Sequence, residues 1–347
     1  MSTHPRIVNT GPFFLAFIRK KSSIGIGSLF ALAGVIVVVL SGCQKSQQVL
    51  PEGTQAFFCR ESTGQELTTA FFKLLQATGS PTGVVGTTAE QDQASRALVA
   101  PFLDPAFQCQ HANGKLYVAS DYMPSDIDQF EIRDLKSTQP VAGVLVTRYH
   151  VSVPGATQPG GNLFMSDQLK PRLTVFHWDD KAKLWKILTH ANFNTPVDAT
   201  LHPDPVTPPS PHVVSTPTED LALGKKVHEN FVQAAWAGQA ALWMHPQAQI
   251  QWASGAGSTG LENYVPSKAV RPGALSDILV TRNGPLLVVS SWASVKGWVR
   301  PREGVMSPNS NPVLCCYLLS ETGDWRLISV AAFRPPNALP QKASGFR

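Results

Sequence analysis

The side chains best suited to acid–base chemistry lie in three short stretches of the chain. Asp121 comes first, Tyr149 and His150 are adjacent, and His190 and Asn192 alternate along a later stretch. Histidine exchanges a proton near neutral pH, so two His rings brought together by the fold could act as acid and base. In the alternative interpretation, His150 and His190 are hydrogen-bonded or surface histidines and no residue is catalytic.

The sequence contains no pattern for nucleophilic or metal-assisted chemistry. It has no GxSxG elbow, and it lacks the CxxC, HExxH and spaced His/Cys patterns of metal sites. We therefore expect neither a metal nor a cofactor. Cys59 and Cys109 are candidates for a disulfide if the protein is exported. Cys315 and Cys316 are neighbours on a predicted strand and should point to opposite faces.

The first 43 residues have the pattern of an export signal. Four Lys and Arg residues precede Cys43 and no acidic residue does, and residues 22–40 form an apolar stretch. The Leu-Ser-Gly-Cys sequence at 40–43 resembles the bacterial lipoprotein box. This resemblance implies that Cys43 is acylated, becomes the first residue of the mature chain and anchors it to a membrane. The alternative is one uncleaved membrane helix over the 19 residues 22–40.

Localisation and charge follow from this signal. Gln44 after the lipidated Cys favours the outer membrane, facing the periplasm, if the cell is Gram-negative. Because four of the 29 basic residues precede Cys43, the mature chain would carry 25 basic and 24 acidic residues. It has no cluster of Lys and Arg of the kind that neutralises phosphates, so we exclude nucleic acid as a partner.

The rest of the chain is one unit written twice. Seven prolines between Pro196 and Pro217 indicate a stiff linker. After it, Thr216 could cap a helix with Glu219 as the second member of a capping box. Segments recur in the same order on both sides of the linker: 103–114 with 244–255, 121–125 with 263–267, 145–148 with 279–282, and 184–196 with 324–336.

Each copy predicts helices followed by antiparallel strands. Helical spacing joins Leu67, Phe71 and Leu74 in the first copy, and Val227, Phe231 and Ala234 in the second. Three long strands should close each copy, with hairpin turns at DDKAK and SETGD. Their predicted ranges are 141–154, 170–178 and 184–194, then 277–295, 312–320 and 324–334.

This order, with the motifs GKLYVASDYMP and KLWKILTHANFNTP and their counterparts, resembles SnoaL-like and ketosteroid-isomerase-like domains of the nuclear transport factor 2 (NTF2) superfamily. The resemblance covers most of 55–197 and 218–337. It implies an α+β fold of two tandem cone-shaped domains, each with N-terminal helices packed on a curved antiparallel sheet around a pocket. The same fold serves isomerases, dehydratases and hydrolases, and also non-catalytic binding domains, so it does not decide the function.

The expected domain organisation follows from these boundaries. The predicted parts are a signal peptide over 1–42, a tether over 43–54, SnoaL-like domain 1 over 55–197, a Pro-rich linker over 198–217, SnoaL-like domain 2 over 218–337, and a tail over 338–347. Tandem copies of such a fold could pack sheet against sheet as an internal pseudo-dimer.

The closing strand compares the chemistry of the two copies. Strict alternation places Trp185, Ile187 and Phe193 on one face, where the second copy keeps similar residues. It places His190 and Asn192 on the other face, where the second copy has Val330 and Ala332. A reaction that needed these groups would be lost from the second copy. The predicted pocket residues are Tyr122, Asn192, Tyr264 and Trp292.

These patterns favour a binding or assembly role over catalysis. The expected partners are the membrane, through acylated Cys43, and either a small apolar ligand or an envelope protein. One alternative is an isomerase, dehydratase or hydrolase acting in the pocket of the first copy. Another is a component of a secretion or cell-wall assembly complex.

Overall fold

A computed structural model describes residues 58–78, 89–112, 116–122, 124, 127–154, 156, 168–193, 216–262, 270–295 and 310–333. Cys43, the predicted signal and tether, and Tyr264 lie outside these residues. Residues Gln48–Arg347 form one compact unit. Among the described helices, none is long and apolar enough to cross a bilayer.

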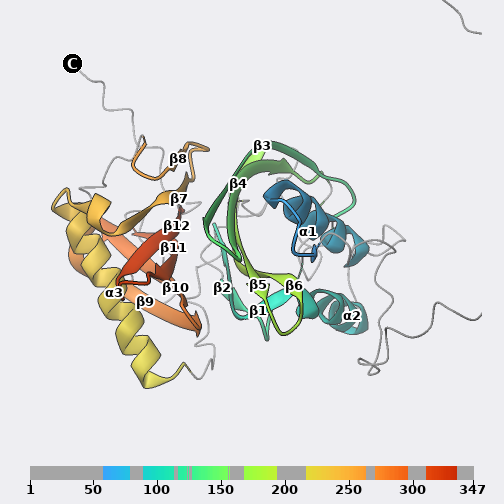
Figure 1. The fold of residues 1–347 in the computed structure, drawn as a ribbon. Coiled ribbons are helices and arrows are strands. Elements are labelled where there is room, and N and C mark those ends of the chain that lie inside the picture. The colour runs from blue at the N-terminus through green and yellow to red at the C-terminus, as the bar shows by residue number, and fades with distance from the viewer. Residues whose placement is uncertain are drawn as a thin grey trace, which may run out of the picture. The chain divides into compact units, whose positions relative to one another are not determined.

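The first half of this unit pairs helices with one curved sheet (Figure 1). Its elements are α1 (Gly64–Thr78), α2 (Ala89–Val99), a 3₁₀ turn (Ala100–Phe102), β1 (Leu103–His111), β2 (Leu116–Val118), β3 (Glu131–Val141), β4 (Val144–Ser152), β5 (Lys170–Asp179) and β6 (Leu184–Asn192). The sheet order is β2-β1-β6-β5-β4-β3. In Figure 1 the sheet curves around α1, which buries the side of α1 that faces it.

The second half repeats this order with one helix in its described part. Its elements are α3 (Thr218–Trp236), a 3₁₀ turn (Ala240–Leu242), β7 (Met244–Trp252), β8 (Gly257–Thr259), β9 (Val270–Asn283), β10 (Leu286–Val295), β11 (Ser310–Leu319) and β12 (Trp325–Ala332). The sheet order is β8-β7-β12-β11-β10-β9, which is the first order shifted by six strands. The predicted duplication and the α+β fold class are confirmed.

Three details of the prediction are wrong. The sheets are mixed, because β1 pairs with β6 and β7 pairs with β12 in parallel. The predicted strand 277–295 is a hairpin of β9 and β10 that turns at Gly284, whose φ of 55° suits glycine. In the first half the prediction missed β3, the strand that corresponds to β9. Thr216 does not cap α3: its hydroxyl donates to the carbonyl of Val280, while the capping box that exists joins Thr63 and Glu66.

Both sheets carry the same irregularity in the closing strand. The pairing of β5 with β6 shifts register between Val175 and Phe176, so Leu188 is an extra residue in β6. The pairing of β11 with β12 shifts at the same place, which makes Ile328 the extra residue in β12. A β-bulge bends a strand and turns the residues beyond it toward the other face.

The bulge corrects the face assignment made from strict alternation. Trp185 and Ile187 belong to the core inside the first half, whereas Leu188, Ala191 and Phe193 belong to a core on the opposite face of the sheet. His190 and Asn192 lie beyond the bulge and line a cavity with residues of the inner core. His190 and Asn192 therefore share the inner face with Trp185 and Ile187, although strict alternation had placed them on opposite faces.

A glycine sets the distance of each first helix from its sheet. A Cβ on Gly64 would lie 2.1 Å from the Ser137 hydroxyl oxygen, and one on Gly224 would lie 2.5 Å from the Val280 methyl groups. The helix-spaced residues predicted from the sequence follow on the same sides and are buried: Leu67, Phe71, Leu74, Val227, Phe231 and Ala234. The repeat thus extends to how closely each helix approaches its sheet.

The outer faces of the two sheets share one hydrophobic core. It joins residues of β4 to β6 with residues of β10 to β12, and Cys316 belongs to it while Cys315 faces the core on the α3 side. Hydrogen bonds cross the same boundary: Gln108 donates to Thr281 at 3.0 Å, and Arg148 donates to Gln249 at 2.8 Å. The two halves are therefore stabilised by contacts with each other.

Candidate functional site

The polar residues inside the first half come from two rows that cross four strands. Residues paired directly across neighbouring strands point to the same face, and so do residues two positions along a strand. The strand pairings define one row as Tyr149, Arg172, Asn192 and His111. They define the adjacent row as Thr147, Thr174, His190 and Cys109.

These rows form a chain of buried hydrogen bonds. The hydroxyl groups of Tyr149 and Thr174 are 3.0 Å apart, and the Thr174 hydroxyl is 3.0 Å from Nδ1 of His190. Phe71 of α1 contacts the His190 ring edge to face, with centroids 5.0 Å apart. The chain holds the imidazole in one orientation against the helix.

Arg172 places a positive charge in the centre of the rows. Its side chain is 2 % exposed, and its Nη1 donates to the carbonyl of Pro171 at 2.8 Å. Burial lowers the pKa of Arg172 to about 10, so the guanidinium remains charged at pH 7. Among the described residues, no carboxylate forms an ion pair with it.

Burial and this charge also determine the state of the neighbouring groups. Burial lowers the pKa of His190 well below its usual value and Arg172 lowers it further, so this imidazole is neutral at pH 7. Burial raises the pKa of Tyr149, Tyr122 and Cys109, so all three stay protonated. The Arg172 guanidinium is therefore charged, whereas His190, Tyr149, Tyr122 and Cys109 near it are neutral.

A cavity of about 30 Å³ opens among these residues. Its polar lining consists of His111, Tyr122, Arg172, His190 and Asn192. Its apolar lining consists of Phe72, Leu75, Ile127, Val153 and Ala156. A space of this size holds one water molecule or one small functional group. No described residue that lines it carries a carboxylate that could act as a base for proton abstraction.

The second half has apolar residues at nearly all the same positions. Its matching rows are Ser291, Val313, Ala332 and Trp252, and then Val289, Cys315, Val330 and Ile250. The fold is kept, but the cation, both imidazoles and the amide of the first-half rows are gone.

The second half instead closes its interior with a residue from the helix. Nδ1 of His228 on α3 is 2.6 Å from the Tyr317 hydroxyl, and Nε2 is 3.0 Å from the Ser291 hydroxyl. His228 is 2 % exposed, and this burial lowers its pKa to about 4. We interpret this cluster as a brace between α3 and the sheet, because both ring nitrogens have partners and the three side chains are buried.

The other predicted site residues are spread over the unit. Tyr149 and Tyr122 are buried with His190, but His150 points to the opposite face, where its Nδ1 lies 3.4 Å from an Asp134 oxygen. Asp121 accepts a hydrogen bond from the Val118 amide at 2.6 Å.

Trp292 lies in the second half, on β10. The disulfide expected between Cys59 and Cys109 is not formed. Cys59 is an exposed free thiol and Cys109 is a buried one.

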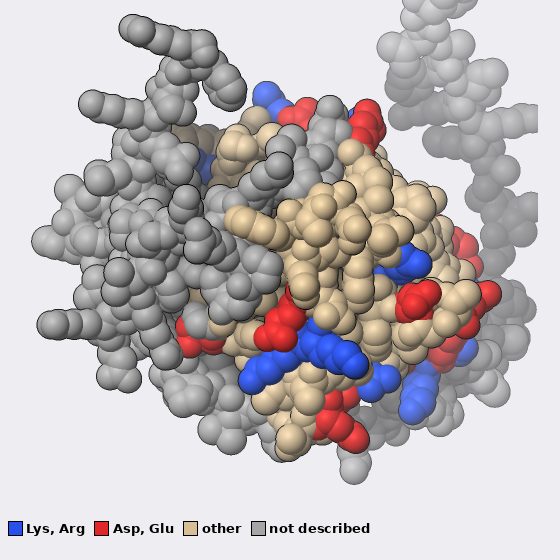
Figure 2. Space-filling view, turned by 90° about the vertical axis from the view of Figure 1, so that its left-hand side faces the viewer, with Lys and Arg blue, Asp and Glu red and all other residues tan. Residues whose placement is uncertain are grey.

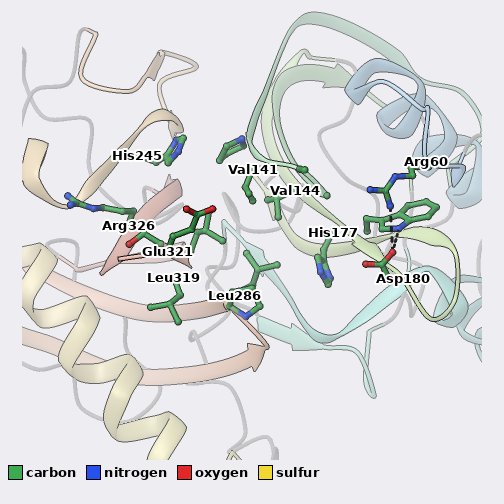
Figure 3. A pocket seen from close by; sticks show the side chains of 17 residues that line it. Arg60, Val141, Val144, His177, Asp180, His245, Leu286, Leu319, Glu321 and Arg326 are labelled. Carbon is green, nitrogen blue, oxygen red and sulfur yellow. Dashed lines mark hydrogen bonds and ion pairs between the residues drawn. The ribbon is translucent and has the colours of Figure 1, made fainter. Parts of the chain in front are cut away.

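A second, open site lies where hairpin ends of both halves meet (Figure 3). Its volume is about 380 Å³. Figure 3 shows Arg60 and Asp180 on one side, Glu321 and Arg326 on the other, and Val144 and Leu286 between them. The charges are of both signs and are distributed around the rim, so this groove shows no convergent set of groups for one ligand.

One buried carboxylate lies beneath this groove. Asp104 is 0 % exposed, and its Oδ2 lies 2.9 Å from Nδ1 of His177 and accepts from the Asn283 amide at 2.8 Å. Its other oxygen accepts from the Ala106 amide. Both carboxylate oxygens have partners, and Oδ2 joins a residue of each half. This arrangement is typical of a structural role.

On the face that Figure 2 draws, charges of both signs lie together on the described residues. In Figure 2, Lys and Arg side chains lie beside Asp and Glu side chains on this face. An example is Arg282 with Asp220, at 3.0 Å.

Sequence reasoning missed Arg172, Asp104 and His228. Arg172 lies in a predicted strand, where a basic residue is ordinarily expected on the solvent side. A signal was present: its position in the second copy is Val313, an apolar residue, which indicates an inner face.

Several solved structures align with about one third of this chain. One is an NTF2-like protein from Cytophaga hutchinsonii, with 19 % identity, 34 % of this chain and 99 % of that chain covered, and a TM-score of 0.27. Another is an NTF2-like protein with a cystatin-like fold from Novosphingobium aromaticivorans, with 13 % identity, coverage of 36 % and 86 %, and a TM-score of 0.25. A third is the CaMKII hub of S. rosetta, with 13 % identity, coverage of 34 % and 99 %, and a TM-score of 0.26.

No protein-family model and no curated protein matches the sequence. Each half has the α+β fold that the NTF2-like resemblance predicted. The strand order and the helices over the sheet carry this conclusion. At such low identity, likeness to solved structures indicates nothing about activity.

Proposed function

We propose that this protein is a lipid-anchored envelope protein that binds a small molecule inside its first half without converting it chemically. The observation that carries the proposal is the contrast between the two interiors. Tyr149, Arg172 and Asn192 in one row of the first half stand where the second half has Ser291, Val313 and Ala332. Because the fold is kept without the polar rows, folding alone does not require them.

A binding role agrees better with the lining of the cavity than catalysis does. His190 is neutral and could accept a proton, but its Nδ1 is engaged with Thr174. No described carboxylate lines the cavity to complete an acid–base pair. The shared core supports a second part of the proposal, in which the second half acts as a structural partner within an internal pseudo-dimer.

Native mass spectrometry of the full-length protein, extracted from its own membranes, tests the binding role. We expect a bound small molecule that gentle activation releases. Ala156 lines the cavity, so Ala156→Met should fill it and abolish the bound species. Ala332→Met in the matching row of the second half is the control and should keep the ligand. A wild-type protein that carries no small molecule in this measurement would contradict the proposal.

The anchor is tested separately. We expect the N-terminal peptide of the mature protein to begin at Cys43 with an acyl mass added. The Cys43→Ser variant should keep the mass of the uncleaved, unmodified chain. An unmodified wild-type protein that retains residues 1–42 would contradict lipid anchoring and favour a membrane helix.

A further inference from the structure

The buried charge of Arg172 indicates what kind of molecule the first half binds. Resting on the proposed function, we infer that the interior binds a small organic acid whose carboxylate pairs with the Arg172 guanidinium. The inference goes beyond a binding role because it names the charge and the recognising residue.

The first argument is the missing counter-charge. A guanidinium has five N–H donors, and the structure gives that of Arg172 one hydrogen bond, to the carbonyl of Pro171. Asn192, its partner across the strands, carries no charge, and the nearby Tyr149, Tyr122 and Cys109 are neutral. A buried charge without a counter-ion is costly, and proteins keep one where a bound group supplies the opposite charge.

The second argument excludes a purely structural cation. Val313 occupies the position of Arg172 in the second sheet. It lies between the two equivalent strands, with the equivalent bulge nearby. The sheet therefore forms with an apolar residue at this place. A structural role would also predict a carboxylate beside the arginine, and among the described residues none is paired with it.

The third argument limits the ligand to a very small monocarboxylate, of the size of formate or acetate. The cavity of about 30 Å³ admits a carboxylate group beside Arg172. The walls around it are Phe72, Leu75, Ile127, Val153 and Ala156, which suit a hydrogen atom or a methyl group on that carboxylate. Arg172 is the one Lys or Arg side chain in the described lining, and it matches a single negative charge better than a phosphate dianion. The planar guanidinium also fits the two oxygens of a carboxylate.

Titration calorimetry on the full chain in detergent tests the inference. The probes are formate and acetate, their neutral amides formamide and acetamide, and inorganic phosphate. We expect the carboxylates to bind at least tenfold more tightly than the amides and phosphate. Arg172→Met should lose about tenfold to a hundredfold in carboxylate affinity and leave amide binding unchanged. Arg172→Lys should lose less because it keeps the charge, and the exposed Arg133→Met is the matched control.

The melting temperature distinguishes a ligand-binding role of Arg172 from a structural role. If Arg172 serves a ligand, ligand-free Arg172→Met should melt at or above the wild-type temperature, because an uncompensated buried charge is removed. A lower melting temperature with unchanged carboxylate affinity would overturn the inference.

The remaining outcomes separate this inference from the proposed function. Equal binding of acids and amides, or preferred binding of phosphate, would overturn the carboxylate inference and leave a binding role standing. Failure of all probes, together with native spectra that contain no small molecule, would overturn both.

Discussion

Phe193 and Phe333 occupy the same position in the two copies, and their rings stack on each other with centroids 4.3 Å apart and planes tilted by 21°. Both follow the last strand of their own sheet and are nearly fully buried in the core that the sheets share. The duplicated residue is therefore its own partner, as in the interface of a two-fold symmetric dimer.

Removing either ring should destabilise the whole unit. We expect Phe193→Ala and Phe333→Ala each to lower the free energy of unfolding by about 3–5 kcal/mol. Because the rings touch, the double variant should lose less than the two single losses combined. Urea unfolding measures both, with Leu242→Ala, at a residue 63 % exposed, as a control expected within about 0.5 kcal/mol of wild type.

The shared core also predicts that neither half is independent. Deleting residues of either copy should lower the melting temperature of the remaining half, since its outer sheet face would then meet water. Isolated halves that melt at the temperature of the full chain would refute this.

The absence of a side chain at Gly224 allows α3 to lie close to Val280 of its sheet. Gly224→Ala should destabilise by about 1–3 kcal/mol through overpacking against Val280, although alanine is the better helix former. Adding Val280→Ala should recover part of the loss. Gln65→Ala, at an exposed position of α1, is the control and should change stability by less than about 0.5 kcal/mol. A Gly224→Ala variant as stable as wild type would show that the helix can move.

Asp179 should contribute stability that acid removes. The Ala182 amide, and after it Lys186, lower the pKa of Asp179 from 3.8 to about 2. The contribution is present above pH 3.8 and disappears as pH falls through 2, because only the folded state holds the carboxylate ionised in that interval. The stability gap between wild type and Asp179→Asn should therefore narrow over this range. Asp180→Asn, at a side chain 77 % exposed, is the control and should change stability at neutral pH by less than about 0.5 kcal/mol.

His228 should make the protein sensitive to milder acid. Burial lowers its pKa from 6.5 to about 4, so between these values the unfolded chain binds a proton that the folded chain does not. Stability should fall by roughly 3 kcal/mol as pH drops from 6.5 to 4 on account of this residue. His228→Gln should flatten the profile over this interval. His245→Gln, at a less buried ring, should flatten it less, and equal slopes in all three proteins would contradict the assignment.

The sequence predicted the parts of the fold that depend on local pattern. The spacing of apolar residues predicted the buried helix faces that contain Leu67 and Val227, and both are buried in the structure. The matching segments predicted the closing strand of each copy, and both strands are present. The disagreement between His190 and Val330 was also visible, because it needs only an alignment of the copies.

Tertiary structure alone decided which residues meet. The extra residue at Leu188 depends on pairing with β5, which precedes it, and with β1, far before it in the chain, so alternation within one strand could not reveal it. The burial of Arg172 likewise depends on Tyr149 and Asn192 of neighbouring strands and on the helix above them. Local sequence determines the period of each element, whereas cross-strand register determines which faces, and which charges, are enclosed.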